Sequence, residues 1–122
     1  MTSKVDIREI TFKFSLDIIN LYKSCIAVNE YILSRQLLKS GTSIGANIEE
    51  AQAAQTKNDF IAKMAIASKE ARETKYWLRL LKEGIILNDN HMIDDLIAKS
   101  EAIINIITKI VKTAMRNNNG KK

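Results

Sequence analysis

The alternation of apolar and polar residues along the chain predicts four long amphipathic helices. Apolar residues recur at steps of three and four, which places them along one face of an α-helix. The first such stripe follows a capping-box sequence, Asp6-Ile7-Arg8-Glu9, in which Asp6 is the expected N-cap. The stripe consists of Ile7, Ile10, Phe14, Ile18, Leu21, Cys25 and Val28. Asn29 is then expected to cap the second helix.

Two glycines lie inside the second pattern, whose stripe comprises Leu33, Leu37, Ser40, Ile44, Ile48 and Ala51. Gly41 and Gly45 each cost about 1 kcal/mol in a helix interior relative to alanine. Segment 40–47 therefore has two interpretations. It is either a loop that breaks the helix, or part of a continuous, bent helix whose small residues admit a neighbouring backbone. The stripe keeps its phase through both glycines, and this favours the continuous helix.

The third pattern starts at Thr56, an expected N-cap with Asp59 three residues on, and ends at Gly84. Its seam alternates steps of four and three, which is typical of shallow-angle bundle packing. The seam residues are Phe60, Met64, Ala67, Ala71, Thr74, Leu78, Leu81 and Ile85. Thr74 on this seam and Asn47 beside the second stripe predict buried hydrogen bonds that fix helix register.

The fourth pattern follows Asn88, Asp89 and Asn90, one of which is the expected cap, and it fades at Arg116. Four helices joined by short connections predict an all-α fold, an antiparallel up-down-up-down four-helix bundle. We expect a single domain over residues 1–116, followed by a flexible polar and basic tail over residues 117–122.

The composition is typical of a helical protein and leaves little room for loop-built chemistry. The 122 residues include no proline and four glycines, and these residue types most often interrupt regular structure. The single cysteine, Cys25, cannot form an internal disulfide, which suits a reducing compartment. Charged residues interrupt the N-terminal segment, and no apolar run approaches about 18 residues. We therefore expect a cytoplasmic protein without a membrane span.

The residues needed for catalysis or metal binding are scarce. His91 is the one histidine of the chain, and Cys25 lies on the apolar stripe of the first helix. Gly41 and Gly45 lack the Lys-Ser/Thr sequence that completes a phosphate-binding loop. A zinc site needs more histidine and cysteine ligands, and the Glu-x-x-His pairs of di-iron bundles are absent from the sequence. We expect no catalytic residue, no metal and no cofactor, and therefore a protein that is not an enzyme.

Basic side chains form rows along two predicted helices, in a chain whose formal net charge is +5. The first basic row consists of Arg72, Lys75, Arg79 and Lys82, with Lys57 expected on the same side upstream. The second basic row consists of Lys109, Lys112 and Arg116. Aligned cations displace counterions from a phosphate backbone, so both rows are predicted nucleic-acid contacts. The alternative is an ordinary solvated face whose charges pair with acidic residues one turn away.

A second apolar face accompanies the seam of the third helix. Ile66, Trp77 and Leu80 lie off the seam at about 100° per residue, and Glu70 and Glu73 share their side. An apolar patch that contains tryptophan is typical of a protein interface. We interpret these five residues, the association face, as a surface for self-assembly. The alternative is that Trp77 covers an edge of the bundle.

Three segments, 34–51, 59–64 and 69–78, resemble the 23S rRNA intervening-sequence protein family. The most specific is SRQLLKSGTSIGANIEEA, a glycine- and serine-rich run within a helical stripe. Many relatives carry proline where this chain has Gly45, which should soften a bend without changing the fold. The resemblance covers most of residues 10–115.

The resemblance implies a small bacterial four-helix bundle that assembles as a homopentamer. It also implies kinship with the accessory variability determinant proteins of diversity-generating retroelements, basic pentameric barrels that associate with a reverse transcriptase and nucleic acid. It supplies no catalytic residue. Two functions stay open: a non-catalytic oligomeric bundle that binds RNA or DNA through its basic rows, or a scaffold module whose partner is another protein.

Overall fold

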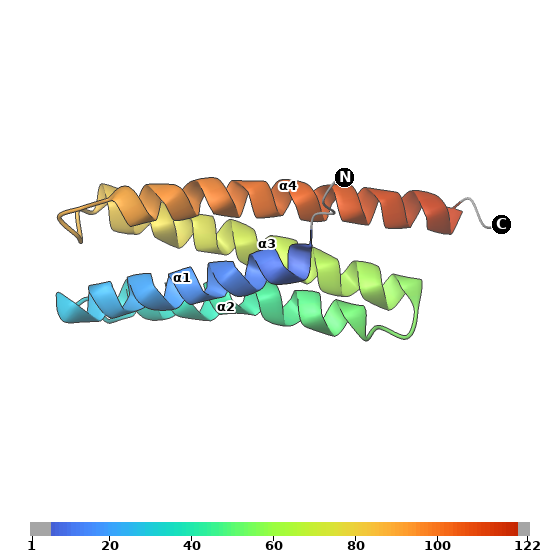
Figure 1. Cartoon of the computed structure of the whole chain (residues 1–122), viewed down its shortest axis with the longest axis horizontal. Helices are drawn as coiled ribbons and strands as arrows, with labels where there is room; N and C mark the ends of the chain where they lie inside the picture. The colour runs from blue at the N-terminus through green and yellow to red at the C-terminus, as the bar shows by residue number, and fades with distance from the viewer. Residues whose placement is uncertain (1–5, 120–122) are drawn as a thin grey trace.

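The computed structural model describes the backbone of residues 6–119, which forms four long α-helices. These are α1 (Ile7–Ala27), α2 (Ile32–Gln52), α3 (Lys57–Glu83) and α4 (His91–Asn119). They lie side by side along one long axis, and α4 extends beyond the start of α1 (Figure 1). No strand occurs in this part of the chain. The predicted all-α four-helix bundle is confirmed.

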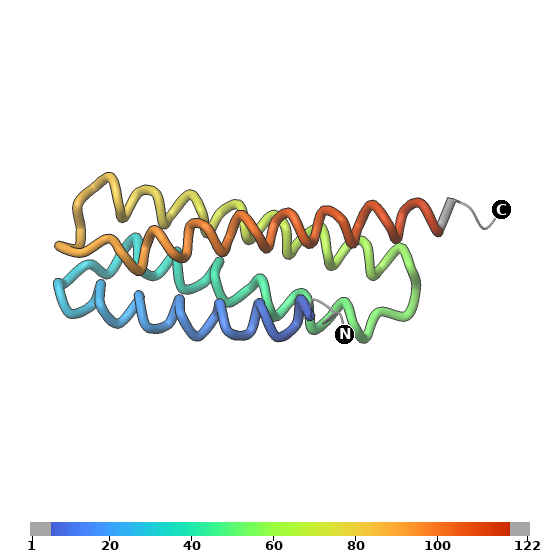
Figure 2. The backbone as a smooth tube through the Cα atoms, turned by 45° about the horizontal axis from the view of Figure 1, so that its top comes forward, coloured from blue at the N-terminus to red at the C-terminus, as the bar shows by residue number. Residues whose placement is uncertain are grey.

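Interhelical contacts show that consecutive helices run in opposite directions, as the tube in Figure 2 also shows. Lys75 Nζ on α3 lies 2.8 Å from Glu101 Oε2 on α4, and Lys82 Nζ lies 2.7 Å from Asp94 Oδ1. Residue numbers therefore fall along α4 as they rise along α3. Contacts between α1 and α2, and between α2 and α3, have the same reversed order.

The core contains apolar side chains from all four helices, mostly at the predicted stripe positions. The largest fully buried side chains are Phe14, Ile18, Leu21, Leu37, Ile44, Ile48, Met64, Leu78, Leu81, Ile93, Leu96 and Ile103. Two predicted stripe residues lie outside the core: Val28 is 51% exposed and Ile85 is 78% exposed. Both follow the last helical residue, since α1 ends at Ala27 and α3 at Glu83, so the helical phase no longer directs them inward.

Helix α2 runs without a break through Gly41 and Gly45, as the continuous phase of its stripe predicted. A Cβ at Gly41 would lie only 2.8 Å from Cγ1 and Cγ2 of Ile18 on α1. A Cβ at Gly45 would meet its nearest atom, the Thr11 carbonyl oxygen, at 3.4 Å. Gly41 is therefore required by the close approach of α1 to α2, whereas Gly45 is not.

The expected caps are correct at α1 and α3 but wrong at α2. Asp6 Oδ1 accepts a hydrogen bond from the Arg8 amide at 3.0 Å, and Thr56 caps α3 in the same manner. Asn29, the expected cap of α2, adopts a φ of 65° and closes the end of α1 instead. The Glu30 carboxylate accepts from the first amides of α2, including that of Ser34 at 2.7 Å. Asparagine tolerates the left-handed conformation that this turn requires.

The start of α4 and its polar end complete the comparison with the predicted boundaries. Asp89 Oδ1 accepts from the His91 amide at 2.8 Å, so Asp89 is the capping side chain among the three candidates. Helix α4 continues past Arg116 to Asn119, so the first part of the predicted tail, 117–122, is helical. The remainder, residues 120–122, lies outside the described residues.

The buried polar residues pair differently from the expected arrangement. Thr74 Oγ1 lies 2.9 Å from Ser40 Oγ, which links α3 to α2 through two buried hydroxyls. Asn47 instead donates to the Ser43 carbonyl one turn back on its own helix. The register pair is therefore Thr74 with Ser40. Among residues 6–119, no helix is long and apolar enough to cross a membrane.

Candidate nucleic-acid interface

The exposed surface of α3 has two flanks, one beside α2 and one beside α4. On the α2 side, Lys63 Nζ lies 3.2 Å from Glu50 Oε1. On the α4 side, Lys75 and Lys82 reach acidic residues of α4. Glu70 and Trp77 of the association face follow Lys63 at seven-residue steps, so they lie on the same side of α3 as Lys63. The arginines of the first basic row lie with Lys75 and Lys82. The two candidate surfaces of α3 thus lie on different flanks and meet at Glu73, which also lines the hollow between α3 and α4.

The two lysines of the first basic row form ion pairs across the α3–α4 seam. Lys75 pairs with Glu101 and Lys82 with Asp94, at N–O distances of 2.8 and 2.7 Å. The hydrogen bond to Asp94, and then the charge of that carboxylate, raise the pKa of the Lys82 ammonium. Both pairs are partly exposed, so solvent screening leaves each with only a small contribution to stability. Their charge is largely matched within the chain and is less available to an external anion.

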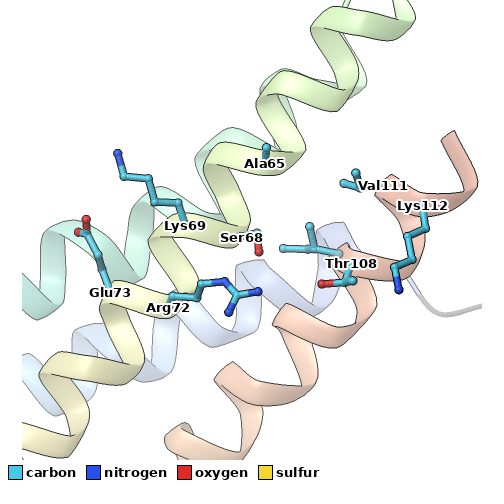
Figure 3. A pocket seen from close by; sticks show the side chains of 9 residues that line it. Ala65, Ser68, Lys69, Arg72, Glu73, Thr108, Val111 and Lys112 are labelled. Carbon is cyan, nitrogen blue, oxygen red and sulfur yellow. The ribbon is translucent and has the colours of Figure 1, made fainter. Parts of the chain in front are cut away.

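The two α3–α4 ion pairs, Lys82 with Asp94 and Lys75 with Glu101, form a ladder along the seam. This ion-pair ladder does not continue to the next heptad, toward the start of α3. Seven residues before Lys75 stands Ser68, and seven residues after Glu101 stands Thr108. Both are short hydroxyl side chains, and Thr108 donates its hydroxyl to its own helix at the Ile104 carbonyl. A groove of about 550 Å³, the α3–α4 groove, opens at this level (Figure 3).

The floor of the α3–α4 groove is apolar and its rim is charged. Ala65, Ile107 and Val111 line its lower part. Arg72 lines it from α3 and Lys112 from α4, and neither has an ion-pair partner within residues 6–117. Figure 3 shows the Arg72 guanidinium extending toward α4. Lys69 and Glu73 also line the groove, but their charged ends are directed away from α4. The two basic rows thus each contribute one cation to a single concave site.

The remaining predicted cations are distributed around this groove. Arg79, Lys109 and Arg116 are exposed and also lack an ion-pair partner within the described side chains. Lys57 does not line the α3–α4 groove. It borders a second hollow of about 380 Å³, together with Phe60 and Ile110, and this hollow shares no lining residue with the first. Lys57 thus borders α4 further toward the start of α3, and its part in the first basic row stays a prediction.

Comparison with known proteins identifies the family. A family model described as 23S rRNA-intervening sequence protein matches residues 3–109. This chain belongs to that family. Lys112 and Arg116 lie just beyond the matched segment, so the α4 side of the groove is built partly outside it.

The structure is also similar to one that has been solved for a related protein. That protein is described as one of unknown function from the S23 ribosomal protein family, from Bacteroides thetaiotaomicron VPI-5482. The two chains are 40% identical with a TM-score of 0.84, over 88% of this chain and 99% of the other. The comparison with curated proteins finds no match.

The association face of this family member is partly accessible. Ile66 is 40% exposed, while Trp77 is half-buried and packs against the core. The Trp77 ring meets Tyr76 edge-on, with centroids 5.1 Å apart, and Tyr76 itself is 54% exposed. Leu80 is half-buried. Trp77 therefore anchors the patch to its own bundle and still presents an edge outward, which keeps self-assembly a prediction.

The two residues considered for nucleophilic chemistry lie in unfavourable settings. Cys25 is fully buried, and burial, followed by the charge of Glu30, raises the pKa of its thiol to about 11. The thiolate is the reactive form of cysteine, so this thiol is protonated and inert near neutral pH. His91 is exposed at the start of α4. Within residues 6–117, no group of three or more His, Cys, Asp or Glu side chains could hold a metal ion.

One exposed apolar surface, on the outer side of α1, was not predicted from the sequence. Phe12 is 61% exposed and Leu16 is 48% exposed on the outer side of α1. With half-buried Ile19 they form a second stripe at i, i+4 and i+7, distinct from the core stripe of the same helix. This spacing in the sequence could have predicted the second apolar surface. It was not used because the core stripe already accounted for the amphipathic pattern of α1.

Proposed function

We propose that this family member is a non-catalytic helical bundle that binds RNA or another nucleic acid at the α3–α4 groove. The proposal is supported by one observation above all: Arg72 and Lys112 come from different helices, line the same groove and have no ion-pair partner among the described side chains. Cations of this kind gain affinity for a phosphate backbone by releasing its counterions. Arg79, Lys109 and Arg116 would extend the contact along the two helices.

Lys75 and Lys82 have a different role in this proposal. Their ion pairs to Glu101 and Asp94 hold α3 beside α4, so they position the groove and contact the nucleic acid weakly. The family description refers to an intervening sequence of 23S rRNA, which favours RNA over DNA as the first ligand to test. The reduced, buried Cys25 is consistent with a cytoplasmic setting.

We further propose that the protein acts as an oligomer, with the association face of α3 between copies. The resemblance to the accessory variability determinant proteins favours a pentamer. Support from this chain is the partly exposed apolar surface of Ile66, Trp77 and Leu80, which lies away from the α3–α4 groove. Several linked copies of a weak cationic site bind a polyanion more tightly than one copy, without new contacts.

A second candidate function is a scaffold that binds another protein. The observation in its favour is the apolar floor of the groove, Ala65, Ile107 and Val111, which phosphate recognition does not require. Recovery of partners from cells with and without nuclease separates the two functions. A polypeptide partner retained after nuclease treatment would favour the scaffold.

The proposed function is tested by removing the two cations of the groove. Arg72→Gln with Lys112→Gln should weaken binding of a labelled single-stranded RNA, and two lost phosphate contacts should lower the slope of log Kd against log salt by about 1.4. Fluorescence anisotropy across a salt series measures both. The matched control is Lys23→Gln with Lys39→Gln, which removes the same charge at exposed positions of α1 and α2. Equal weakening by both double variants would refute the groove as the site.

A further inference from the structure

The apolar floor of the α3–α4 groove is the feature that phosphate binding leaves unexplained. Ile107, which is buried, and Val111, which is half-buried, line it from α4, and Ala65 lines it from α3. A strand held only by its phosphates would leave this apolar surface in contact with water, and burial of such surface is favourable. The floor therefore fits a ligand that presents an apolar surface of its own between the two cations.

The hydroxyl group of Ser68 is available to such a ligand. Ser68 is half-buried, and its side chain has no hydrogen-bond partner within residues 6–117. In contrast, the hydroxyls of Ser100 and Thr108 donate to carbonyl oxygens about one turn back on their own helix. Figure 3 shows the Ser68 oxygen on the side of α3 that faces the groove. A purely apolar occupant would cover this hydroxyl and leave it unpaired, which is costly, so the occupant should also carry hydrogen-bonding groups.

The two cations of the groove lie on opposite sides of the Ser68–Thr108 level. The ion pairs set the register of the antiparallel helices, in which Ser68 is level with Thr108. Arg72 is one turn beyond Ser68 and Lys112 one turn beyond Thr108, so their backbone positions are about 12 Å apart along the axes at 1.5 Å per residue. Figure 3 shows the charged ends of Arg72 and Lys112 on either side of Thr108. A strand that crosses the groove can present one phosphate to each cation and the intervening base to the floor.

The groove has room for one base. Its volume is about 550 Å³, whereas an apolar cavity of about 150 Å³ in another protein holds benzene. A nucleobase combines apolar faces with an edge of donors and acceptors, so a face can cover Ile107 and Val111 while the edge reaches Ser68. The guanidinium plane of Arg72 can stack on the opposite face. A base within a duplex is unable to bind in this way, because its faces are stacked and its edge is paired.

We infer that the α3–α4 groove holds one unpaired nucleobase of an RNA strand, with the flanking phosphates at Arg72 and Lys112. This inference rests on the proposed function and adds a preference to it. Cations alone bind any phosphate backbone, whereas a base site selects single strands, loops and bulges, in which a base is free to turn outward.

Removal of the base tests the inference without a change of charge. A labelled single-stranded RNA is compared with a strand of the same length whose central nucleotides are abasic, so that the two carry equal numbers of phosphates. Fluorescence anisotropy should show the abasic strand binding about fivefold more weakly, as for the weakest stacked bases, with the same slope of log Kd against log salt. A duplex with one bulged nucleotide should likewise bind more tightly than the perfect duplex.

A variant that fills the groove gives the second measurement. Ser68→Leu occupies the floor and leaves both cations in place. It should reduce the affinity for the intact strand to that for the abasic strand, and it should leave the affinity for the abasic strand unchanged. The matched control is Ser24→Leu, the same substitution at an exposed position of α1, which should keep the intact-to-abasic ratio of the native protein.

Equal affinities of the native protein for the intact and abasic strands overturn the inference. If Arg72→Gln with Lys112→Gln still weakens binding of both strands, the proposed function stands without a base site. If that double variant binds both strands as well as the native protein does, the proposed function and the inference both fail. A nuclease-resistant polypeptide partner that is lost in Ser68→Leu, together with unchanged RNA binding, would place a protein segment in the groove and also overturn the inference.

Discussion

Alanine substitutions at the two glycines of α2 should have opposite effects on stability. At Gly41 the new methyl group would lie 2.8 Å from Cγ1 and from Cγ2 of Ile18, and 3.2 Å from Cδ1. Those atoms belong to a β-branched side chain with one strongly preferred rotamer in a helix, so Ile18 cannot turn away cheaply. Overpacking of this kind costs about 1–3 kcal/mol, and the gain in helix propensity returns about 1 kcal/mol. We expect Gly41→Ala to be destabilising by up to about 2 kcal/mol.

At Gly45 the same substitution meets ordinary packing distances. The nearest atoms are the Thr11 carbonyl oxygen at 3.4 Å and two hydroxyl oxygens at 3.5 Å, so the methyl group is accommodated. The propensity gain then dominates, and Gly45→Ala should stabilise the protein by about 0.5–1 kcal/mol. The chemical change is identical at the two positions, so the difference in sign isolates the approach of α1 to α2.

Urea denaturation followed by circular dichroism measures both effects. Each variant should be compared at two protein concentrations, because any association of copies would contribute to apparent stability. Ile18→Ala removes the atoms that crowd Gly41, so the cost of Gly41→Ala should largely disappear in that background, giving a coupling energy of about 1–3 kcal/mol. If Gly41→Ala stabilises as much as Gly45→Ala, or if Ile18→Ala leaves its effect unchanged, the close-approach argument is refuted.

Three further predictions concern the buried thiol, the buried hydroxyl pair and the ladder. The pKa of the Cys25 thiol is about 11 in the folded protein, against an ordinary value of 9.0. This difference contributes roughly 2–3 kcal/mol to the free energy of unfolding below pH 9, and the contribution is lost as pH rises toward 11. Urea titrations at a series of pH values from 9 to 11 should show a shrinking difference in stability between the native protein and Cys25→Ala. A constant difference would contradict the raised pKa. Thr74→Val should cost about 1–2 kcal/mol because Ser40 Oγ loses its 2.9 Å contact with Thr74 and keeps only its 3.4 Å hydrogen bond to the Leu37 carbonyl. Thr74→Val with Ser40→Ala should cost less than the single change, and thermal melts compare the two. Ser68→Lys with Thr108→Glu should add a third ion pair, raise stability by under about 1 kcal/mol and weaken RNA binding in the anisotropy assay, and unchanged RNA affinity would separate the groove from the proposed function.

The core and the helix order were predictable because they depend on short-range periodicity. Each stripe repeats at steps of three and four along one helix, and that information is local. The sequence predictions that were wrong concern residues at the ends of the helices, where the helical conformation stops. Val28 and Ile85 continue the stripes in sequence but follow the last helical residues. Asn29 does not cap α2, because it adopts the left-handed conformation that closes the end of α1. Turn geometry depends on how two helices meet, which a single stripe does not contain.

The candidate site was predictable in its residues but not in its arrangement. The spacing of Arg72, Lys75, Arg79 and Lys82 is correct for one side of α3, yet it does not show that α4 provides carboxylates for the two lysines. That pairing depends on the register between α3 and α4, which the connecting segment 84–90 sets. The same register places Lys112 and Arg72 in the lining of one groove. Neither basic row alone predicts a groove, because the groove is a property of two helices.

The position of each cation relative to the seam determines whether it pairs with a carboxylate of α4 or has no such partner. Lys82 and Lys75 occupy successive heptad positions that face α4, where Asp94 and Glu101 occupy the matching positions. Arg72 lies between the levels of Ser68 and Lys75, and no ion pair joins it to a described carboxylate of α4. The ladder stops where two small side chains, those of Ser68 and Thr108, occupy the next level. The absence of an ion pair at this level leaves room for the groove and leaves Arg72 and Lys112 without a carboxylate partner among the described side chains. Under the proposed function, the small size of these two residues therefore determines where an anionic partner would bind.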